Sequence, residues 1–173
     1  MSKDHCESAS DEVLLQKARS GNRDAFVQFA RRFWPIVGRV AWSMVGDVSQ
    51  ALRATEEVLG IALHSSQRPE IPVRLWIYRL AIWLAIVRRR SGRSAARPET
   101  PLFEALGGLD CKDRAALVLC DVEGVAVGDA GAILEASPAE IRKHAHRARI
   151  HLARVLGADA IDLEMNSLER LSA

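Results

Sequence analysis

The sequence predicts an all-α protein built from two small helical domains that are joined by a flexible linker. Apolar residues recur at helical spacing through most of the 173 residues, and no stretch alternates apolar and polar residues as a half-buried strand does. Hydrophobic residues make up 49% of the chain, which supports a packed core rather than global disorder. The segment SGRSAARPETP, residues 91–101, interrupts the helical periodicity and separates the two parts.

The first domain is predicted over residues 8–90 and contains four helices. They are expected from Asp11 to just before Gly21, and over residues 23–45, 49–64 and 73–90. Asn22 is a suitable N-cap for the second helix, and Pro35 inside that helix is expected to kink it. Gly46-Asp47 and the segment SSQRPEIP mark the two following breaks.

A linker is predicted over residues 91–108, followed by a second domain over residues 109–157. Its helices are expected near residues 111–121, 127–135 and 138–156, and the short gap between the last two is typical of a helix-turn-helix. The tail, residues 158–173, is expected to form one short amphipathic helix through Ile161, Met165, Leu168 and Leu171.

Two glycines interrupt the first helix of the predicted helix-turn-helix. Gly128 and Gly131 are each expected to cost about 0.5–1 kcal/mol relative to Ala. A close helix crossing would explain Gly131, whereas nothing in the sequence explains Gly128. Ala126 stands where a capping Ser is expected, so we predict a domain of marginal stability.

The last of these helices begins within SPAEIRKHAHRARIHL, residues 137–152. Ser137 and Glu140 have the spacing of a capping box, and Pro138 suits the first helical position. An apolar stripe is predicted through Ile141, Ala145, Ala148, Leu152 and Val155. The residues off this stripe that are expected to face solvent are Arg142, Lys143, His146, Arg147 and Arg149.

This helix is strongly basic although the whole chain carries a net charge of only +2. Between residues 140 and 154 five cations stand against Glu140 alone, which gives 5 − 1 = +4 with histidines taken as neutral. Two interpretations stay open for the helix taken alone: a solvated face, or a surface that binds nucleic-acid phosphates and bases.

Several functional classes are disfavoured. The three cysteines have no CxxC spacing, which is typical of a reduced cytosolic protein, and His5-Cys6 has no partner pair at zinc-ligand spacing. No phosphate-binding glycine loop, HExxH or nucleophile elbow occurs, so no enzymatic activity and no cofactor are expected. The N-terminus does not read as a signal peptide, and the run at residues 75–87 is too short to cross a bilayer, so we expect a cytoplasmic protein without membrane insertion.

Together these stretches resemble a bacterial sigma factor of the extracytoplasmic-function group. The residues that carry the resemblance are DAFVQFARRFWPIVGRVAWSMVGD at 24–47, TEEVLGIAL at 55–63, RLWIYRLA at 74–81, and the stretch from 113 to 149. The family pattern there is a hydrophobic-Glu-Gly turn, a helix-turn-helix, and a helix that ends in His-Arg-Ala-Arg. Glu123-Gly124 and His146-Arg147-Ala148-Arg149 match it.

The resemblance implies three contact surfaces and a sequence-specific initiation function. The second domain would bind the minus-thirty-five element of promoter DNA through Ser137, Glu140, Arg142, Lys143, His146, Arg147 and Arg149. The first domain would bind the opened minus-ten element through Arg79, Trp83, Arg88, Arg89 and Arg90, and the core RNA polymerase through Asp47, Arg53, Glu56 and Glu57. An anti-sigma factor is a further partner that the resemblance implies.

The first domain departs from the family pattern. In QALRATEEVL, Leu52 and Arg53 replace an acidic pair, and in AIWLAIV three apolar residues replace polar ones. Trp83 lies seven residues after Trp76, so the two share a helical face, which favours a core or protein-interface role over base stacking. Two alternatives to the sigma function therefore stay open: a sigma-like interaction protein that opens no promoter, and a plain helix-turn-helix regulator using residues 109–156.

Overall fold

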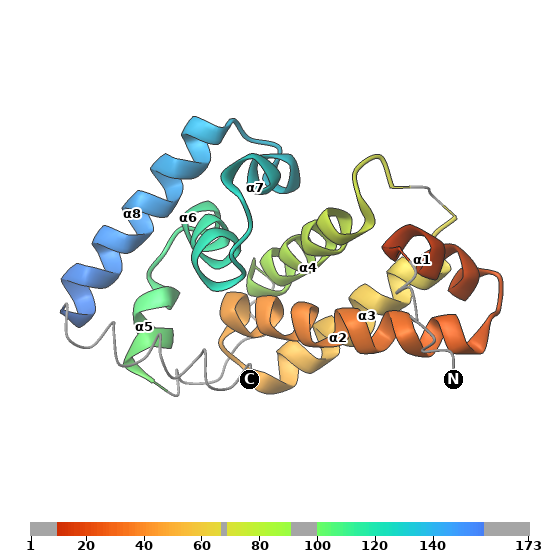
Figure 1. Ribbon diagram of the computed structural model, residues 1–173. Helices are drawn as coiled ribbons and strands as arrows, with labels where there is room; N and C mark the ends of the chain where they lie inside the picture. Colours follow the sequence, from red (N-terminus) through yellow and green to blue (C-terminus); the bar gives the residue numbers. More distant parts are fainter. Residues whose placement is uncertain (1–9, 67–68, 91–99, 158–173) are drawn as a thin grey trace, which may run out of the picture.

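The computed structural model describes residues 10–66, 69–90 and 100–157, and these residues form helices and connecting turns without any strand (Figure 1). The all-α prediction is confirmed. The helices are α1 Asp11–Arg19, α2 Arg23–Val45, α3 Val48–His64, α4 Val73–Arg90, α5 Pro101–Gly107, α6 Cys111–Leu117, the π-helix η1 Val118–Val122, α7 Val127–Leu134 and α8 Pro138–Leu156. The predicted tail helix lies outside the described residues.

Short polar side chains begin the helices of the first part, as their sequence positions suggest. The Asn22 side chain accepts a hydrogen bond from the Ala25 amide at 2.9 Å, and the Asp47 carboxylate accepts one from the Gln50 amide at 2.7 Å. Gly46 ends α2 with a φ of 78°, a conformation that glycine adopts without strain. Asp47 is thus committed to the cap of α3.

Helix α2 is the centre of the N-terminal part, because α1, α3 and α4 all pack against it (Figure 1). Its buried face includes Phe29 and Phe33, whose ring centroids are 4.6 Å apart. The helix continues past the exposed Pro35 to Val45. Burial of this long apolar face stabilises the bundle at about 25 cal/mol per Å² of apolar surface removed from water. The four predicted helices of this part are confirmed.

Helix α5 corrects the predicted linker. The sequence predicts a flexible segment over residues 91–108, but residues 101–107 form a helix. Its Leu102, Phe103 and Leu106 are buried against Ala148 and Leu152 of α8. The local signals were present, since Thr100 caps the helix through a hydrogen bond from the Phe103 amide and Pro101 occupies its first position. The C-terminal helical unit therefore begins at about residue 100.

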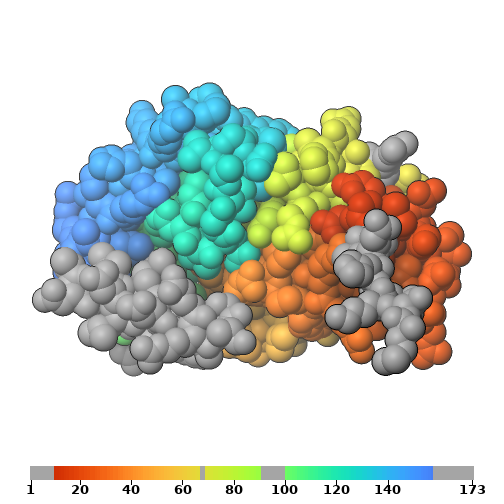
Figure 2. All heavy atoms as spheres, in the orientation of Figure 1, coloured from red at the N-terminus to blue at the C-terminus, as the bar shows by residue number. Residues whose placement is uncertain are grey.

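The two parts share one hydrophobic core. A single buried cluster joins side chains of α2 and α4 to those of η1, α7 and α8, and α4 packs directly against α7 (Figure 2). The Trp42 and Phe103 rings add a contact at 4.7 Å between centroids. Residues 91–99 lie outside the described ranges, so the division into two domains stays a prediction, while the packing of the helices on either side is an observed feature.

The glycines of α7 have different surroundings. A Cβ at Gly131 would lie 2.7 Å from the Ala136 carbonyl oxygen, so the close approach is to the turn backbone rather than to a crossing helix. A Cβ at Gly128 would meet nothing within 4 Å. Ala126 supplies no side-chain cap, as predicted. A crossing helix is therefore not the reason for Gly131, and the structure, like the sequence, gives no packing reason for Gly128.

Candidate nucleic-acid interface

The start of α8 is fixed by the predicted capping box. The Ser137 hydroxyl accepts a hydrogen bond from the Glu140 amide at 3.2 Å, and the Glu140 carboxylate accepts from the Ser137 amide at 2.8 Å. The bond from the Ser137 amide, and then a bond that the Ser137 hydroxyl donates to the same carboxylate at 2.7 Å, lower the pKa of the Glu140 carboxyl. Ser137 and Glu140 therefore hold the first turn of α8 in place, and their contact with DNA stays a prediction.

The exposed side of α8 carries the predicted basic residues. Ile141, Ala145, Ala148 and Leu152 are buried, as the apolar stripe predicts, whereas Val155 is 53% exposed and does not belong to the stripe. The predicted basic residues are all exposed: Arg142, Lys143, His146, Arg147 and Arg149. Helix α8 lies on the side of the molecule away from α1 (Figure 1).

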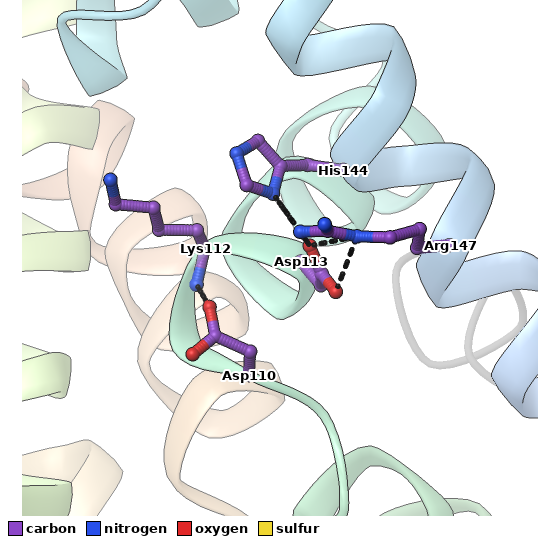
Figure 3. Close-up of polar contacts among 5 residues, drawn as sticks. All are labelled: Asp110, Lys112, Asp113, His144 and Arg147. Atoms are coloured by element: carbon purple, nitrogen blue, oxygen red, sulfur yellow. Dashed lines mark hydrogen bonds and ion pairs between the residues drawn. The ribbon is translucent and has the colours of Figure 1, made fainter.

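Two of these arginines are held by acidic residues of the neighbouring helix, as Figure 3 shows for one of them. Arg147 pairs with the Asp113 carboxylate at 2.6 Å, and the His144 Nδ1 lies 2.5 Å from the same carboxylate. Arg149 pairs with Asp121 at 2.6 Å. Arg147 and Arg149 must therefore exchange or share these partners to bind phosphate.

Arg142 and Lys143 are in a different state. They lie in the first turn and a half of α8, are exposed, and take part in no ion pair within the described ranges of the chain. Side chains at the N-terminal end of such a helix are the ones that reach base edges in a major groove. Base reading by Arg142 and Lys143 stays a prediction, and their exposure is compatible with it.

Asp113 organises the buried side of this surface. Burial alone would raise the pKa of its carboxyl, but the hydrogen bonds from Arg147 and His144 outweigh burial, so that the pKa is lowered. The side chain lies on α6, the helix that packs along α8, and it is only 12% exposed. The ionised Asp113 therefore fixes the rotamers of two side chains on the recognition face.

Helix α4 carries the residues predicted for the minus-ten element. Trp83 is 55% exposed, so a core role is wrong, whereas the protein-interface role that the spacing from Trp76 equally favoured stays a prediction. Ile82 is 2% exposed and belongs to the core, so it is not part of an exposed apolar cluster with Trp83. The buried face of α4 meets α2 and α3. Ile82 and Trp83 are consecutive residues, so their side chains point in different directions around the helix axis.

The cations of α4 are mostly engaged by other helices. Arg79 donates to the Ala132 carbonyl oxygen at 2.5 Å and pairs with Glu135 at 3.1 Å, so α7 covers it. Arg89 donates to the Gly107 carbonyl oxygen at 3.0 Å, and Arg90 is exposed. Arg88 binds Glu57 and Gln50 of α3, which joins a residue predicted to bind DNA to one predicted to bind polymerase.

The predicted polymerase-binding residues lie on the outer side of α3. Arg53, Glu56 and Glu57 are exposed, and Asp47 forms the N-cap of the helix. Leu52 and Val48 are exposed beside them, so the surface is mixed in charge and partly apolar. The structure therefore brings these residues to one face without showing what they bind.

Glu123 has a role that sequence reasoning missed. Its carboxylate, 1% exposed, accepts two hydrogen bonds from Arg39 at 2.9 Å and one from the Tyr78 hydroxyl at 3.0 Å. Burial first, and then the Glu123 charge and hydrogen bond, raise the pKa of Tyr78. Glu123 was identified only as part of a Glu-Gly turn, yet it ties the end of η1 to α2 and α4 of the other part.

Arg114 is a second buried link that the sequence did not indicate. It is 2% exposed, and its Nε donates to the Ser43 carbonyl oxygen at 2.7 Å, near the C-terminus of α2. Burial, followed by the charge of Arg89, lowers its pKa to about 9, so Arg114 is still charged at neutral pH. The negative end of the α2 dipole offsets part of the cost of burying this charge.

Other kinds of site are not indicated. Within the described residues, no group of three or more His, Cys, Asp and Glu side chains is arranged to hold a metal ion. None of the described helices has the length and apolar character needed to cross a membrane. The His5-Cys6 pair lies outside the described residues.

Comparisons with known proteins agree with this geometry. The family model for sigma-70, region 4, matches residues 100–152, which begin just before α5 and end within α8. The ECF RNA polymerase sigma factor SigM of Mycobacterium tuberculosis (strain ATCC 25618 / H37Rv) is 28% identical over 170 residues, which span 86% of this chain and 85% of SigM.

Two solved structures have the same fold. The chain resembles CnrH, solved in complex with the cytosolic domain of CnrY, with a TM-score of 0.68, 25% identity, and coverage of 87% of this chain and 99% of CnrH. It also resembles the sigma factor RpoE of Bartonella quintana, solved with the anti-sigma factor NepR, with a TM-score of 0.63, 21% identity, and coverage of 78% and 98%. Over most of its length the chain is thus similar to RNA polymerase sigma factors of the extracytoplasmic-function group.

Proposed function

We propose that this chain directs core RNA polymerase to a restricted set of promoters through three surfaces. The exposed face of α8 binds the upstream duplex element, with Arg142 and Lys143 on base edges and Arg154 on phosphate. The exposed face of α4 around Trp83 and Arg90 binds the opened minus-ten strand, and the outer face of α3 binds polymerase. The protein has no enzymatic role in this process and acts in the cytoplasm.

The observation that supports the proposal most is the organisation of α8. Its first turn is fixed by two reciprocal hydrogen bonds, one side of it is buried, and near its N-terminus the other side presents cations that form no ion pair with any described residue. A rigid helix of this kind matches the way helix-turn-helix proteins enter a major groove. A solvated basic face alone needs no capping box and no fixed rotamers beside it.

In the free protein, the packing of the two parts leaves the proposed DNA-binding face of α8 more accessible than that of α4. The α8 face is open, whereas Arg79 on α4 is held by the Ala132 carbonyl and Glu135 of the α7 region. Binding of the opened strand at Arg79 therefore needs α7 to move away from α4. We infer that the free chain recognises duplex before it recognises single strand, and that assembly with polymerase releases α4.

An anti-sigma partner is part of the same proposal. The two similar structures were solved with CnrY and with the anti-sigma factor NepR, respectively. On this chain Val48, Leu52, Trp83 and Val87 are exposed apolar side chains of α3 and α4, and exposed apolar surface is typical of protein interfaces. A partner that covers these residues would compete with polymerase and with the opened strand.

A binding experiment separates the three interpretations of the chain. The full chain would be mixed with core polymerase and with a pool of genomic duplex fragments, and the retained protein and DNA would be identified. The sigma function predicts a stable complex with polymerase that selects a small set of fragments. Fragment selection without polymerase binding would support a plain helix-turn-helix regulator, and polymerase binding without selection would support an interaction protein.

A further inference from the structure

A cavity of about 110 Å³ lies where α2 meets the C-terminal helices. Its apolar wall is formed by Leu102, Phe103 and Leu106 of α5, with Leu117, Val118 and Leu152 from α6, η1 and α8. Ser43 closes it on the α2 side. The cavity therefore touches both parts of the molecule, and no surface used in the proposed function includes it except at Arg149.

The charged groups at the edge of this cavity are paired with each other. Asp121 and Arg149 form its charged edge, and they bind each other through two hydrogen bonds of 2.6 and 2.8 Å. The Ser43 carbonyl oxygen accepts from the buried Arg114. A molecule in the cavity therefore gains mainly apolar contact and finds little polar recognition.

Size and lining together define the class of ligand. Apolar cavities of this order stay dry and accept benzene-sized molecules, because water finds too few hydrogen-bond partners in them. The cavity is smaller than the usual drug-sized site of about 300–1,000 Å³, although its apolar wall with few polar groups is of the same kind, so only a small ligand fits. A compact apolar ring or a short branched alkyl compound fits both requirements.

We propose that this cavity is a binding site for a small apolar molecule, whose occupancy fastens α5 and α8 to the C-terminal end of α2. Phe103 supplies the link, because it lines the cavity on one side and contacts Trp42 of α2 through its ring. A molecule bound against Phe103 restricts this ring and thereby strengthens the contact between the two parts. The proposal is independent of which promoters the protein recognises.

The test uses benzene as the probe and the full chain as the target. Benzene titration, followed by methyl NMR, is expected to shift the Leu102, Leu106, Leu117 and Leu152 signals along one saturable curve. The melting temperature should rise with benzene concentration. Hydrogen exchange at the end of α2 should slow as the site fills. Pyridine, a ring of the same size with a polar nitrogen, should bind more weakly.

Cavity-filling variants provide the control. Val118→Phe and, if that variant does not fold, Leu106→Phe are expected to abolish the saturable shifts, because the added atoms occupy the cavity. Val13→Phe adds the same ring to an exposed position of α1 and should leave benzene binding unchanged. The proposal is overturned if the unmodified chain shows no saturable shift, if the shifts map outside the cavity wall, or if a folded filled variant still binds.

Discussion

At the scale of single residues, the cations of α8 differ in how firmly the protein holds them. Arg147 is bound to a carboxylate of α6, and Arg149 is bound to a carboxylate of η1. Arg142 and Lys143 form no ion pair with any described residue. Sequence spacing alone predicts only that all of these side chains lie on one exposed face, and it does not distinguish between them. Their separation into held and free side chains depends on Asp113 and Asp121, whose contacts are made only in the folded chain.

Replacement of Arg142 by Ala is expected to weaken binding selectively. If Arg142 contacts a base edge through two hydrogen bonds, the loss on the recognised duplex is about 1–3 kcal/mol. Arg154→Ala, at the exposed end of the same helix, should weaken all duplexes equally and lower the salt slope by about one. Equilibrium titrations on matched and scrambled duplexes measure both effects. Equal weakening of all duplexes by Arg142→Ala would contradict the base-reading role.

Asp113→Asn is expected to reduce stability in a pH-dependent way. The folded state lowers the pKa of Asp113 below its ordinary value of 3.8, so the charged form stabilises the fold above that pH. The free energy of unfolding should fall by about 1–2 kcal/mol near neutral pH, since Arg147 is partly exposed. The difference should shrink as pH falls below 3.8, where the wild-type carboxyl becomes protonated.

Denaturant titrations at several pH values check this expectation. The exposed Glu56→Gln is a suitable control, because Glu56 makes no ion pair within the described ranges and its replacement should change stability little. A difference between wild type and Asp113→Asn that stays constant down to pH 2 would show that the Asp113 charge does not stabilise the fold.

At the scale of helices, most boundaries were predictable because they depend on local signals. Capping residues and the 3.6-residue period located α2, α3, α4 and α8, and the capping box of α8 was identified before its geometry was known. Helix α5 was missed because its flanking Pro and Gly residues resemble those of a linker. Its helical state depends on burial of Leu102 and Phe103 against distant α8, which no local window contains.

The orientation of α4 could not be predicted from the sequence. Trp76 and Trp83 share a face by spacing, but α4 is apolar on most sides, so periodicity does not specify which side meets α2. The structure places Ile82 inside and Trp83 outside. Contacts between segments far apart in the chain likewise cover Arg79 and bury the Glu123 carboxylate. Arg142 forms no ion pair with any described residue, which the sequence also does not show.

The glycines of α7 give a matched pair of substitutions. Gly128→Ala should raise the free energy of unfolding by about 0.5–1 kcal/mol, because Ala favours the helix and its Cβ meets no atom. Gly131→Ala should lower it, because the added Cβ would lie 2.7 Å from the Ala136 carbonyl oxygen. Chemical denaturation of both variants measures the difference. The same sign for both would contradict the packing described for α7.

Trp83→Ala is expected to affect DNA binding more than stability. An exposed indole that stacks on an unpaired base contributes about 1–3 kcal/mol, whereas its removal from the surface changes little in the fold. Binding of a single-stranded minus-ten oligonucleotide and the melting temperature should be measured together in the presence of polymerase. Trp34→Ala removes another exposed indole, which is 41% exposed on α2, and should change neither quantity.

The opposite result would assign Trp83 a different role. Unchanged strand affinity in Trp83→Ala would remove Trp83 from the DNA-binding surface. If the same variant also lost affinity for a protein partner, the exposed apolar side of α4 would be a protein interface.

At the scale of the whole molecule, the two helical parts are joined by polar contacts, of which those of Glu123 and Arg114 are buried, as well as by a shared apolar core. Glu123 reaches Arg39 and Tyr78, Arg114 reaches the end of α2, and Arg79 reaches the α7 region. Buried polar groups of this kind are costly when their partners are removed. The closed packing is therefore specific, and it determines how much of α4 is available to DNA.

Glu123→Gln should loosen this packing. The variant keeps the shape of the side chain but leaves Arg39 without its carboxylate, and we expect a loss of about 1–3 kcal/mol in the free energy of unfolding. The radius of gyration from small-angle scattering should increase, and single-strand affinity should rise because Arg79 is released. Glu104→Gln on the exposed side of α5 is the control. An unchanged radius with unchanged strand affinity would show that Glu123 does not hold the parts together.

Run-off transcription is the measurement that tests the central claim most directly. Core polymerase would be reconstituted with the full chain on a library of genomic fragments, and the starts of the transcripts would be mapped. The proposed function predicts transcripts from a small set of sites that share an upstream element, and their loss with Arg142→Ala but not with Trp34→Ala. Polymerase that binds the chain yet produces no transcripts above core enzyme alone would contradict the proposed function.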